Sequence, residues 1–180
     1  MHIKIPKFLS AEECKLIEKT LLEKEQEILN LPANTDYYSG TTARYEHYNF
    51  LKFVPEIDIT SKFFDLAIMQ DENEFWIQCW GNVLNKGDAI KIHSHGPPNS
   101  IFYAANIFIS GPDDCFTYYD DTGHVSNAAG ELHLIDCYLE HSVKENINEQ
   151  PRLSIACDIH FKDPKDFENY DKRIIYANRN

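Results

Sequence analysis

Apolar and polar residues alternate with a period of two from Glu74 to Phe161, which is typical of half-buried β-strands. Turn-forming sequences at 85–88, 96–98, 110–113, 121–123 and 128–130 divide this region into short segments. We expect six strands, over Phe75–Val83, Ala89–His95, Ile101–Ile109, Cys115–Tyr119, Glu131–Ile135 and Leu153–Phe161. Many short strands behind a helical front predict a mostly β protein with flanking helices (α+β class) around a double-sheet jelly-roll core, the double-stranded β-helix.

The N-terminal part of the chain carries helix signals. Ser10 and Glu13 have the S-x-x-E spacing of a capping box, and apolar residues then recur at helical intervals until Pro32. We therefore expect a helix over residues 11–29 and a second, shorter one over 57–69. Residues 31–56 show no clear period and are expected to form a loop or an irregular edge strand. Beyond Phe161 the chain is charged and poor in apolar residues, so it is expected to wrap the surface or fray.

A length of 180 residues is about one domain's worth of sequence. We expect a single domain with a helical front at about 1–73, a β core at about 74–161 and a C-terminal extension at 162–180. The formal net charge of −12 repels phosphate backbones and anionic lipids, so neither a nucleic-acid nor a membrane partner is expected. The sequence shows no secretory signal, no apolar span and no C-x-x-C pair among its five cysteines, which predicts a cytoplasmic protein.

Three histidines are candidates for a metal site. His93 and His95 share one face of their expected strand, so their imidazoles point the same way. Such a pair suits a transition metal, which imidazole nitrogens bind at about 2.0 to 2.2 Å, although H-x-H pairs also occur by chance on solvated strands. His141 follows after a strand and a short connection and can return to the same end of a barrel. For His133 and His160 we expect a surface or hydrogen-bonded role instead.

Arg152 begins the last expected strand, in which an apolar face alternates with a polar one. The polar face carries Arg152, Ser154, Ala156 and Asp158. A planar guanidinium beside a hydroxyl is suited to holding a carboxylate through charge-assisted hydrogen bonds. Taken alone, this arginine is better explained as a surface residue at a strand end. The upstream histidines are what favour the anion-binding interpretation.

Together these features resemble the Fe(II)/2-oxoglutarate-dependent dioxygenase superfamily, in particular its small prolyl-hydroxylase-like branch of bacteria and phages. The resemblance covers most of the chain, and it depends on the order and spacing of several motifs because none of them is decisive alone. The motifs are Phe8–Cys14, Trp80–Val83, Lys86–Asp88, His93-Ser94-His95 with Pro98–Ser100, Gly130–Ile135, His141-Ser142-Val143 and Arg152-Leu153-Ser154.

The resemblance implies a ligand set for iron. It implies that His93, the side chain at position 95 and His141 hold Fe(II), with 2-oxoglutarate and O2 in the open positions. The sequence departs from the superfamily at His95, where most members have Asp or Glu. We favour a three-histidine site. The alternatives are two histidines completed by water or an anion, or a carboxylate supplied by Asp120 or Asp158.

The resemblance also implies how the co-substrate and substrate are held. Arg152 would receive the far carboxylate of 2-oxoglutarate, with Ser154 adding a hydrogen bond, and Asn82 and Tyr103 are further candidates for the pocket wall. The tyrosine-rich segment either forms a lid over the substrate or caps the apolar end of the barrel. Its tyrosines are Tyr37, Tyr38, Tyr45 and Tyr48.

The function expected from the resemblance is oxidation, most often hydroxylation, of a small molecule or a protein side chain, with release of succinate and CO2. The acidic net charge favours a neutral or basic substrate. Two other functions remain open: a cupin-like three-histidine dioxygenase that uses no keto acid, and a non-enzymatic metal-binding jelly-roll module. Arg152 and Ser154 discriminate, because neither alternative needs a dicarboxylate anchor. A homodimer is compatible with the sequence.

Overall fold

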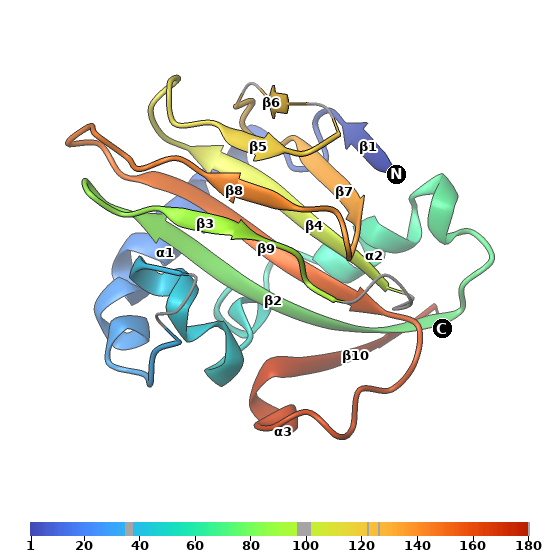
Figure 1. The fold of residues 1–180 in the computed structure, drawn as a ribbon. Helices are drawn as coiled ribbons and strands as arrows, with labels where there is room; N and C mark the ends of the chain where they lie inside the picture. Colours follow the sequence, from blue (N-terminus) through green and yellow to red (C-terminus); the bar gives the residue numbers. More distant parts are fainter. Residues whose placement is uncertain (35–37, 97–101, 122, 126, 180) are drawn as a thin grey trace.

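The computed structural model describes residues 1–34, 38–96, 102–121, 123–125 and 127–179, and its strands form two antiparallel sheets that face each other (Figure 1). The larger sheet has the order β1-β7-β4-β9-β2-β10 and the smaller one β3-β8-β5-β6. The predicted jelly roll with flanking helices is confirmed. The strands are β1 His2–Ile5, β2 Glu74–Leu84, β3 Ile90–His93, β4 Phe102–Ser110, β5 Thr117–Tyr119, β6 Gly123–Val125, β7 Leu132–Asp136, β8 His141–Val143, β9 Arg152–His160 and β10 Ile174–Asn178.

All six expected strands are present with shifted ends, and four further strands, β1, β6, β8 and β10, lie outside the prediction. Strands β6 and β8 have three residues each, too few for a period of two to be recognised. Strands β1 and β10 form the two edges of the larger sheet and are held by pairing with β7 and β2. The helical front therefore contains a strand. The expectation that residues 162–180 only wrap the surface or fray is wrong for β10.

Helix α1 (Ala11–Leu29) confirms the capping-box prediction. Ser10 Oγ accepts a hydrogen bond from the Glu13 N–H at 3.2 Å, and Glu13 Oε2 accepts one from the Ser10 N–H at 2.7 Å. The apolar side of the helix packs on β2 and β4, where Ile17 and Leu21 are fully buried. Gly81 permits this close approach, because a Cβ on it would lie 2.2 Å from Leu21 Cδ2.

The segment between α1 and β2 is helical, not the loop or edge strand expected over 31–56. It contains short 3-10 helices at Gly40–His47, Phe50–Phe53 and Ala67–Met69, and helix α2 at Ile59–Phe64, so the helix expected over 57–69 is divided in two. Thr41 ties the first 3-10 helix to β2. Its hydroxyl donates to the Gly81 carbonyl at 2.7 Å and accepts from the Val83 N–H at 2.8 Å. Such tertiary bonds hold a segment whose sequence has no period of its own.

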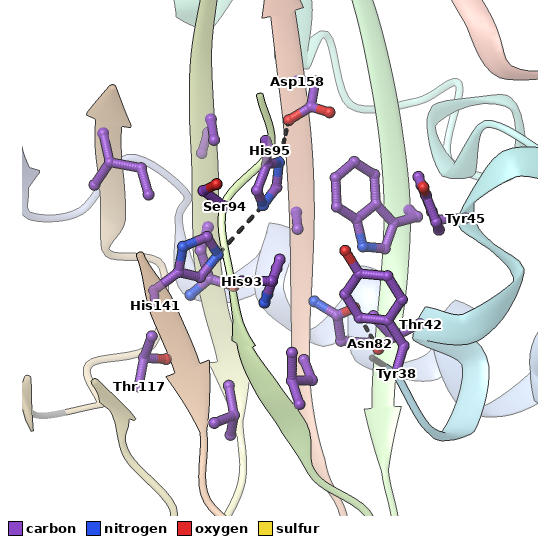
Figure 2. Close-up of a pocket in the computed structure, with 18 of the residues that line it drawn as sticks. Tyr38, Thr42, Tyr45, Asn82, His93, Ser94, His95, Thr117, His141 and Asp158 are labelled. Carbon is purple, nitrogen blue, oxygen red and sulfur yellow. Dashed lines mark hydrogen bonds and ion pairs between the residues drawn. The ribbon is translucent and has the colours of Figure 1, made fainter. Parts of the chain in front are cut away.

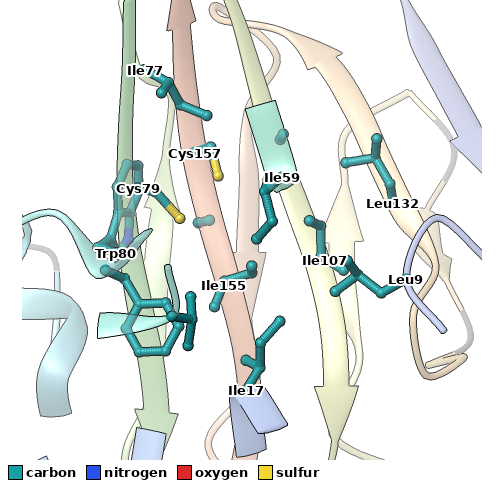
Figure 3. Close-up of a cluster of buried hydrophobic side chains, with 14 of the residues drawn as sticks. Leu9, Ile17, Ile59, Ile77, Cys79, Trp80, Ile107, Leu132, Ile155 and Cys157 are labelled. Carbon is teal, nitrogen blue, oxygen red and sulfur yellow. The ribbon is translucent and has the colours of Figure 1, made fainter. Parts of the chain in front are cut away.

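The main hydrophobic core lies between these helices and the outer face of the larger sheet (Figure 3). Strand β9 buries Leu153, Ile155, Cys157 and Ile159 in this core, and its alternate residues face the space between the sheets. A four-residue helix, α3 (Tyr170–Arg173), precedes β10. All five cysteines are buried, and no disulfide forms among the described residues. Among the described helices, none combines the length and the apolar character that crossing a bilayer requires.

Candidate metal centre and the cavity beside it

Three histidines meet between the two sheets (Figure 2). His93 ends β3 and His141 begins β8, and the two residues are paired across these antiparallel strands. His95 follows β3, where its backbone N–H donates to the Cys137 carbonyl at 2.7 Å. One potential ligand atom from each histidine lies within 4.8 Å of the other two. The Nε2 atoms of His95 and His141 are 3.2 Å apart, close to the ~3 Å that separates adjacent ligands with metal bonds of about 2.1 Å.

The outer nitrogen of each imidazole contacts a hydrogen-bond acceptor. Nδ1 of His93 and Nδ1 of His141 contact the carbonyl oxygen two residues earlier in the chain, at 2.9 and 3.0 Å. His95 Nδ1 lies 2.5 Å from Asp158 Oδ1. Carbonyls and carboxylates only accept, so each Nδ1 carries the proton and each neutral ring has its lone pair on Nε2. The lone pairs of His95 and His141 then face each other, an arrangement that calls for a positive charge between them.

Burial keeps two of these rings neutral. Desolvation, with a smaller contribution from His95, lowers the pKa of His93 to about 4 and lowers the pKa of His141 well below its ordinary 6.5. Neutral imidazole is the form that binds metals. At neutral pH these two side chains therefore present lone pairs without first losing a proton.

A cavity of about 120 Å³ adjoins the histidines between the sheets. Its wall combines aromatic, small and polar side chains, including Tyr38, Tyr45, Trp80, Tyr119, Ala104, Ala156, Thr42, Asn82, Asn106 and Thr117 (Figure 2). Tyr119 pairs with His141 across β5 and β8, and its buried hydroxyl has no hydrogen-bond partner among the described residues. A buried hydroxyl without a partner is available to a bound ligand.

Arg152 is fully buried behind one end of this cavity. Its Nε donates to the Cys115 carbonyl at 3.1 Å, and its terminal nitrogens donate to Thr117 Oγ1 at 2.8 Å and Ser154 Oγ at 3.0 Å. Thr117 lines the cavity, so the guanidinium lies one side chain behind the wall. No described acidic residue pairs with it, and burial lowers its pKa from the ordinary value of an arginine. A buried cation without an anion costs free energy, which a bound carboxylate would offset.

Asn82 connects the cavity to this arginine. Its side-chain oxygen accepts from the Thr42 hydroxyl at 2.7 Å, and its Nδ2 donates to Ser154 Oγ at 3.1 Å. Ser154 in turn accepts from Arg152. This end of the cavity thus presents hydroxyl and amide groups with a cation behind them, a combination suited to a carboxylate.

The tyrosines expected either to form a lid or to cap the barrel are divided between the cavity and the core. Tyr38 and Tyr45 line it, and the Tyr38 ring meets the His93 ring edge-on with centroids 5.0 Å apart. Tyr48 is instead buried in the core, where its hydroxyl accepts from the Gly81 N–H at 2.9 Å. Tyr37 lies outside the described residues.

Tyr103, a predicted pocket residue, lies on the core side of β4. It packs edge-on against Phe161 at the margin of the main core. Ala104 and Asn106 line the cavity from the same strand. Tyr103 therefore packs at the margin of the core, because the strand alternation directs its ring away from the histidines.

Two histidines that were expected to be surface or hydrogen-bonded residues are both buried. The His133 ring nitrogens contact Glu131 Oε1 at 3.0 Å and His2 Nε2 at 2.9 Å, which confirms a hydrogen-bonded role. His160 is 7% exposed, and its Nε2 has no hydrogen-bond partner among the described residues.

The sequence reasoning missed Thr117 and Tyr119 at the cavity wall. They lie two residues apart on an expected strand, so a period of two places both on one face. Nothing local shows that this face points at the histidines. Asp158 was considered only as a metal ligand; its contact with His95 Nδ1 depends on residues 63 positions apart in the chain.

Comparison with known proteins bears on the fold. No protein-family model matches the chain, and a search of curated proteins finds no match either. A structure described as an oxidoreductase of the 2OG-Fe(II) oxygenase family, from Burkholderia pseudomallei, is 14% identical with a TM-score of 0.56, and the match covers 88% of this chain and 84% of the other. The chain has the fold of a 2OG-Fe(II) oxygenase.

Two further structures agree. A prolyl-4-hydroxylase from Pseudomonas putida is 12% identical with a TM-score of 0.58, covering 89% of this chain and 92% of that one. HygX from Streptomyces hygroscopicus, solved with nickel and 2-oxoglutarate bound, is 15% identical with a TM-score of 0.54, covering 88% of this chain and 81% of that one. At these identities the similarity establishes the shared 2OG-oxygenase fold.

Proposed function

We propose that this chain is an Fe(II)- and 2-oxoglutarate-dependent oxygenase that hydroxylates a small molecule or a protein side chain, with release of succinate and CO2. One observation carries the proposal: three converging imidazoles stand beside a cavity whose wall at Thr117 is backed by Arg152, a buried cation without an acidic partner among the described residues. The shared fold with 2OG-Fe(II) oxygenases supports it.

The residues present fit a transition metal such as iron. His93, His95 and His141 would hold it through nitrogen, and imidazole is a suitable ligand for iron. The Nε2 atoms of His95 and His141 are 3.2 Å apart, which is close to the spacing of two ligands on one metal ion. Asp158 supports the three-histidine set over the carboxylate alternative, because it is already bonded to His95 Nδ1 and orients that ring.

The residues also fit a dicarboxylate. A keto acid chelated at the metal would extend toward Thr117 and Asn82, with Arg152 neutralising its far carboxylate and Ser154 supporting the arginine. The Tyr119 hydroxyl has no hydrogen-bond partner among the described residues, so it too could bond to the keto acid. In oxygenases of this fold, iron, 2-oxoglutarate and O2 together supply an oxidant strong enough for unactivated C–H bonds.

The protein's own part is to bind, orient and exclude water. Aromatic rings of Tyr38, Tyr45 and Trp80 wall the histidine side of the cavity, which limits the access of water to a reactive centre. Asp158 fixes the orientation of His95, and Arg152 fixes the end of the keto acid remote from the metal. These roles set the position of the co-substrate before a substrate enters.

The proposal is tested by anaerobic titration of the Fe(II)-loaded protein with 2-oxoglutarate. We expect heat from keto-acid binding and the weak visible charge-transfer band of a chelated keto acid, followed in air by slow succinate formation without substrate. No detectable keto-acid binding to the metal-loaded protein would overturn the proposal. Oxygen consumption that needs metal but no keto acid would instead identify a cupin-like dioxygenase.

A further inference from the structure

A groove on the surface leads from the metal centre toward the C-terminal segment. Tyr45, His95 and Asp158 line both the cavity and this groove, so the two are continuous. The outer part of the groove is formed by residues that follow β9, namely Lys162, Asp163, Pro164, Asp166, Phe167 and Glu168. Any substrate that reaches the histidines from this side passes along these residues.

The groove is strongly acidic. Five carboxylates line it, against only two cations, Lys162 and Arg173; the acids are Glu46, Asp158, Asp163, Asp166 and Glu168. Asp158 is bonded to His95, and Asp163 accepts a hydrogen bond from the Tyr170 hydroxyl at 2.9 Å. Asp166 and Glu168 are exposed and form no ion pair with the described residues. A surface of this sign attracts cations and repels anions.

A buried histidine in the groove independently indicates a ligand. The His160 side chain lines the groove and is only 7% exposed, yet its Nε2 has no hydrogen-bond partner among the described residues. Its ring lies between Phe102, with centroids 4.5 Å apart, and Phe167, 5.4 Å away and edge-on. Buried polar atoms in folded proteins are normally paired, so this nitrogen is suited to a hydrogen bond from a bound molecule.

The aromatic side chains of the groove already hold one cation. The Arg173 guanidinium lies 4.9 Å from the Phe167 ring centre and 5.6 Å from that of Tyr45. Its Nε and one terminal nitrogen donate to Gln78 Oε1 at 3.1 and 2.6 Å, so it is held by an amide and by rings. Exposed aromatic faces among carboxylates are the surroundings in which ammonium and guanidinium groups bind.

We propose that this groove binds the cationic group of the substrate, a primary ammonium or a guanidinium, and that the substrate is therefore a basic amino acid or a peptide with a basic side chain. The inference rests on the proposed function, because it takes the metal centre at the inner end of the groove as the place of oxidation. The carboxylates supply long-range attraction, Phe167 contacts the cation or its alkyl stem, and His160 Nε2 accepts a hydrogen bond.

The test measures binding of defined cations to the Fe(II)-loaded protein with 2-oxoglutarate under anaerobic conditions. The probes are free L-lysine, free L-arginine, and acetylated pentapeptide amides Gly-Gly-X-Gly-Gly in which X is lysine, arginine, glutamate or norleucine. We expect the lysine or arginine probes to bind, with an affinity that falls with added salt. The glutamate peptide should not bind. Norleucine has the alkyl stem of lysine without its charge, so it isolates the contribution of the cation. Comparing the free amino acids with the peptides shows whether the cationic group belongs to a basic amino acid or to a peptide side chain.

Two variants locate the binding in the groove. Asp166→Asn with Glu168→Gln should weaken the cationic probes about three- to tenfold. The matched control, Asp71→Asn with Glu56→Gln, also removes one aspartate and one glutamate charge, but from exposed positions outside the groove. It should bind the cationic probes as the wild type does. His160→Phe keeps an aromatic ring between Phe102 and Phe167 but removes the unpaired nitrogen, and should also weaken binding.

Equal affinity for the lysine and norleucine peptides, no binding of any cationic probe, or an unchanged affinity in the Asp166/Glu168 variant would overturn the inference. The keto-acid titration is read separately. Keto-acid binding without a preference for cations removes this inference and leaves the proposed function standing. Cation binding without keto-acid binding overturns the proposed function, and with it the assignment of the cation as substrate.

Discussion

Replacing Arg152 by methionine should separate keto-acid binding from metal binding. Methionine is a flexible, uncharged chain that can fill the buried space behind Thr117. The change removes one cation and its three hydrogen bonds, to the Cys115 carbonyl and to the hydroxyls of Thr117 and Ser154. The candidate metal ligands are not among these partners, so the iron affinity should be unchanged.

The size of the effect follows from the burial of Arg152. Removing the buried partner of a carboxylate costs about 2 to 5 kcal/mol of binding free energy, or about 30-fold to several thousandfold in the Kd for 2-oxoglutarate. The free energy of unfolding of the ligand-free protein should change much less. Hydrogen bonds to a charged group contribute about 1.5 to 3 kcal/mol each, and the desolvation of an unpaired buried cation opposes them by several kcal/mol.

The assay is anaerobic calorimetry with 2-oxoglutarate on four iron-loaded proteins: the wild type, Arg152→Met, Arg152→Lys and Arg179→Met. The lysine variant should recover only part of the affinity, because an ammonium supplies the charge without the planar fork. Arg179 donates to the backbone carbonyls of Met69 and Gln70, away from the cavity, so its variant controls for the loss of one positive charge. An unchanged keto-acid affinity in Arg152→Met would refute the anchor; a parallel loss of iron would show that the change damages the whole site.

Three further predictions concern the metal site and the fold. His95→Ala should lower iron affinity and His95→Asp should retain iron, while Asp158→Asn should lower iron affinity about 10- to 100-fold by releasing the ring of His95. Dissociation constants for iron check this. A wild-type value for His95→Ala would eliminate the three-histidine site. Gly130→Ala should lower the free energy of unfolding by about 1 to 3 kcal/mol in urea titrations, because φ is +77° and a Cβ would lie 2.3 Å from the Leu9 carbonyl oxygen. An unchanged midpoint of urea unfolding would contradict this. The hydrogen bonds from Ser61 hold the pKa of Asp58 below its ordinary 3.8, so the α2 cap stabilises the fold above about pH 4 and this contribution is lost as the pH falls through the folded-state pKa. In urea titrations at several pH values, the free energy of unfolding of Asp58→Asn should therefore fall less steeply toward acid pH than that of the wild type. An identical pH dependence would count against this.

Periodicity within single segments was readable from the sequence. The capping box and apolar spacing of residues 10–29 predict α1 because both ends of each interaction lie within a few residues. The alternation in β9 likewise places Arg152 and Ser154 on one face and Ile155 in the core. The same rule, applied to β4, would have directed Tyr103 to the core. It was assigned to the pocket only by resemblance.

Only the tertiary structure decided how these faces meet. His93 and His141 converge because β3 pairs with β8, and Asp158 reaches His95 because β9 passes beside the end of β3. The acidic groove likewise arises where the residues after β9 return past the three histidines before β10 joins the larger sheet. Short-range patterns determine which side of an element a residue occupies. Strand order and register, which depend on burying the whole core at once, determine what that side faces.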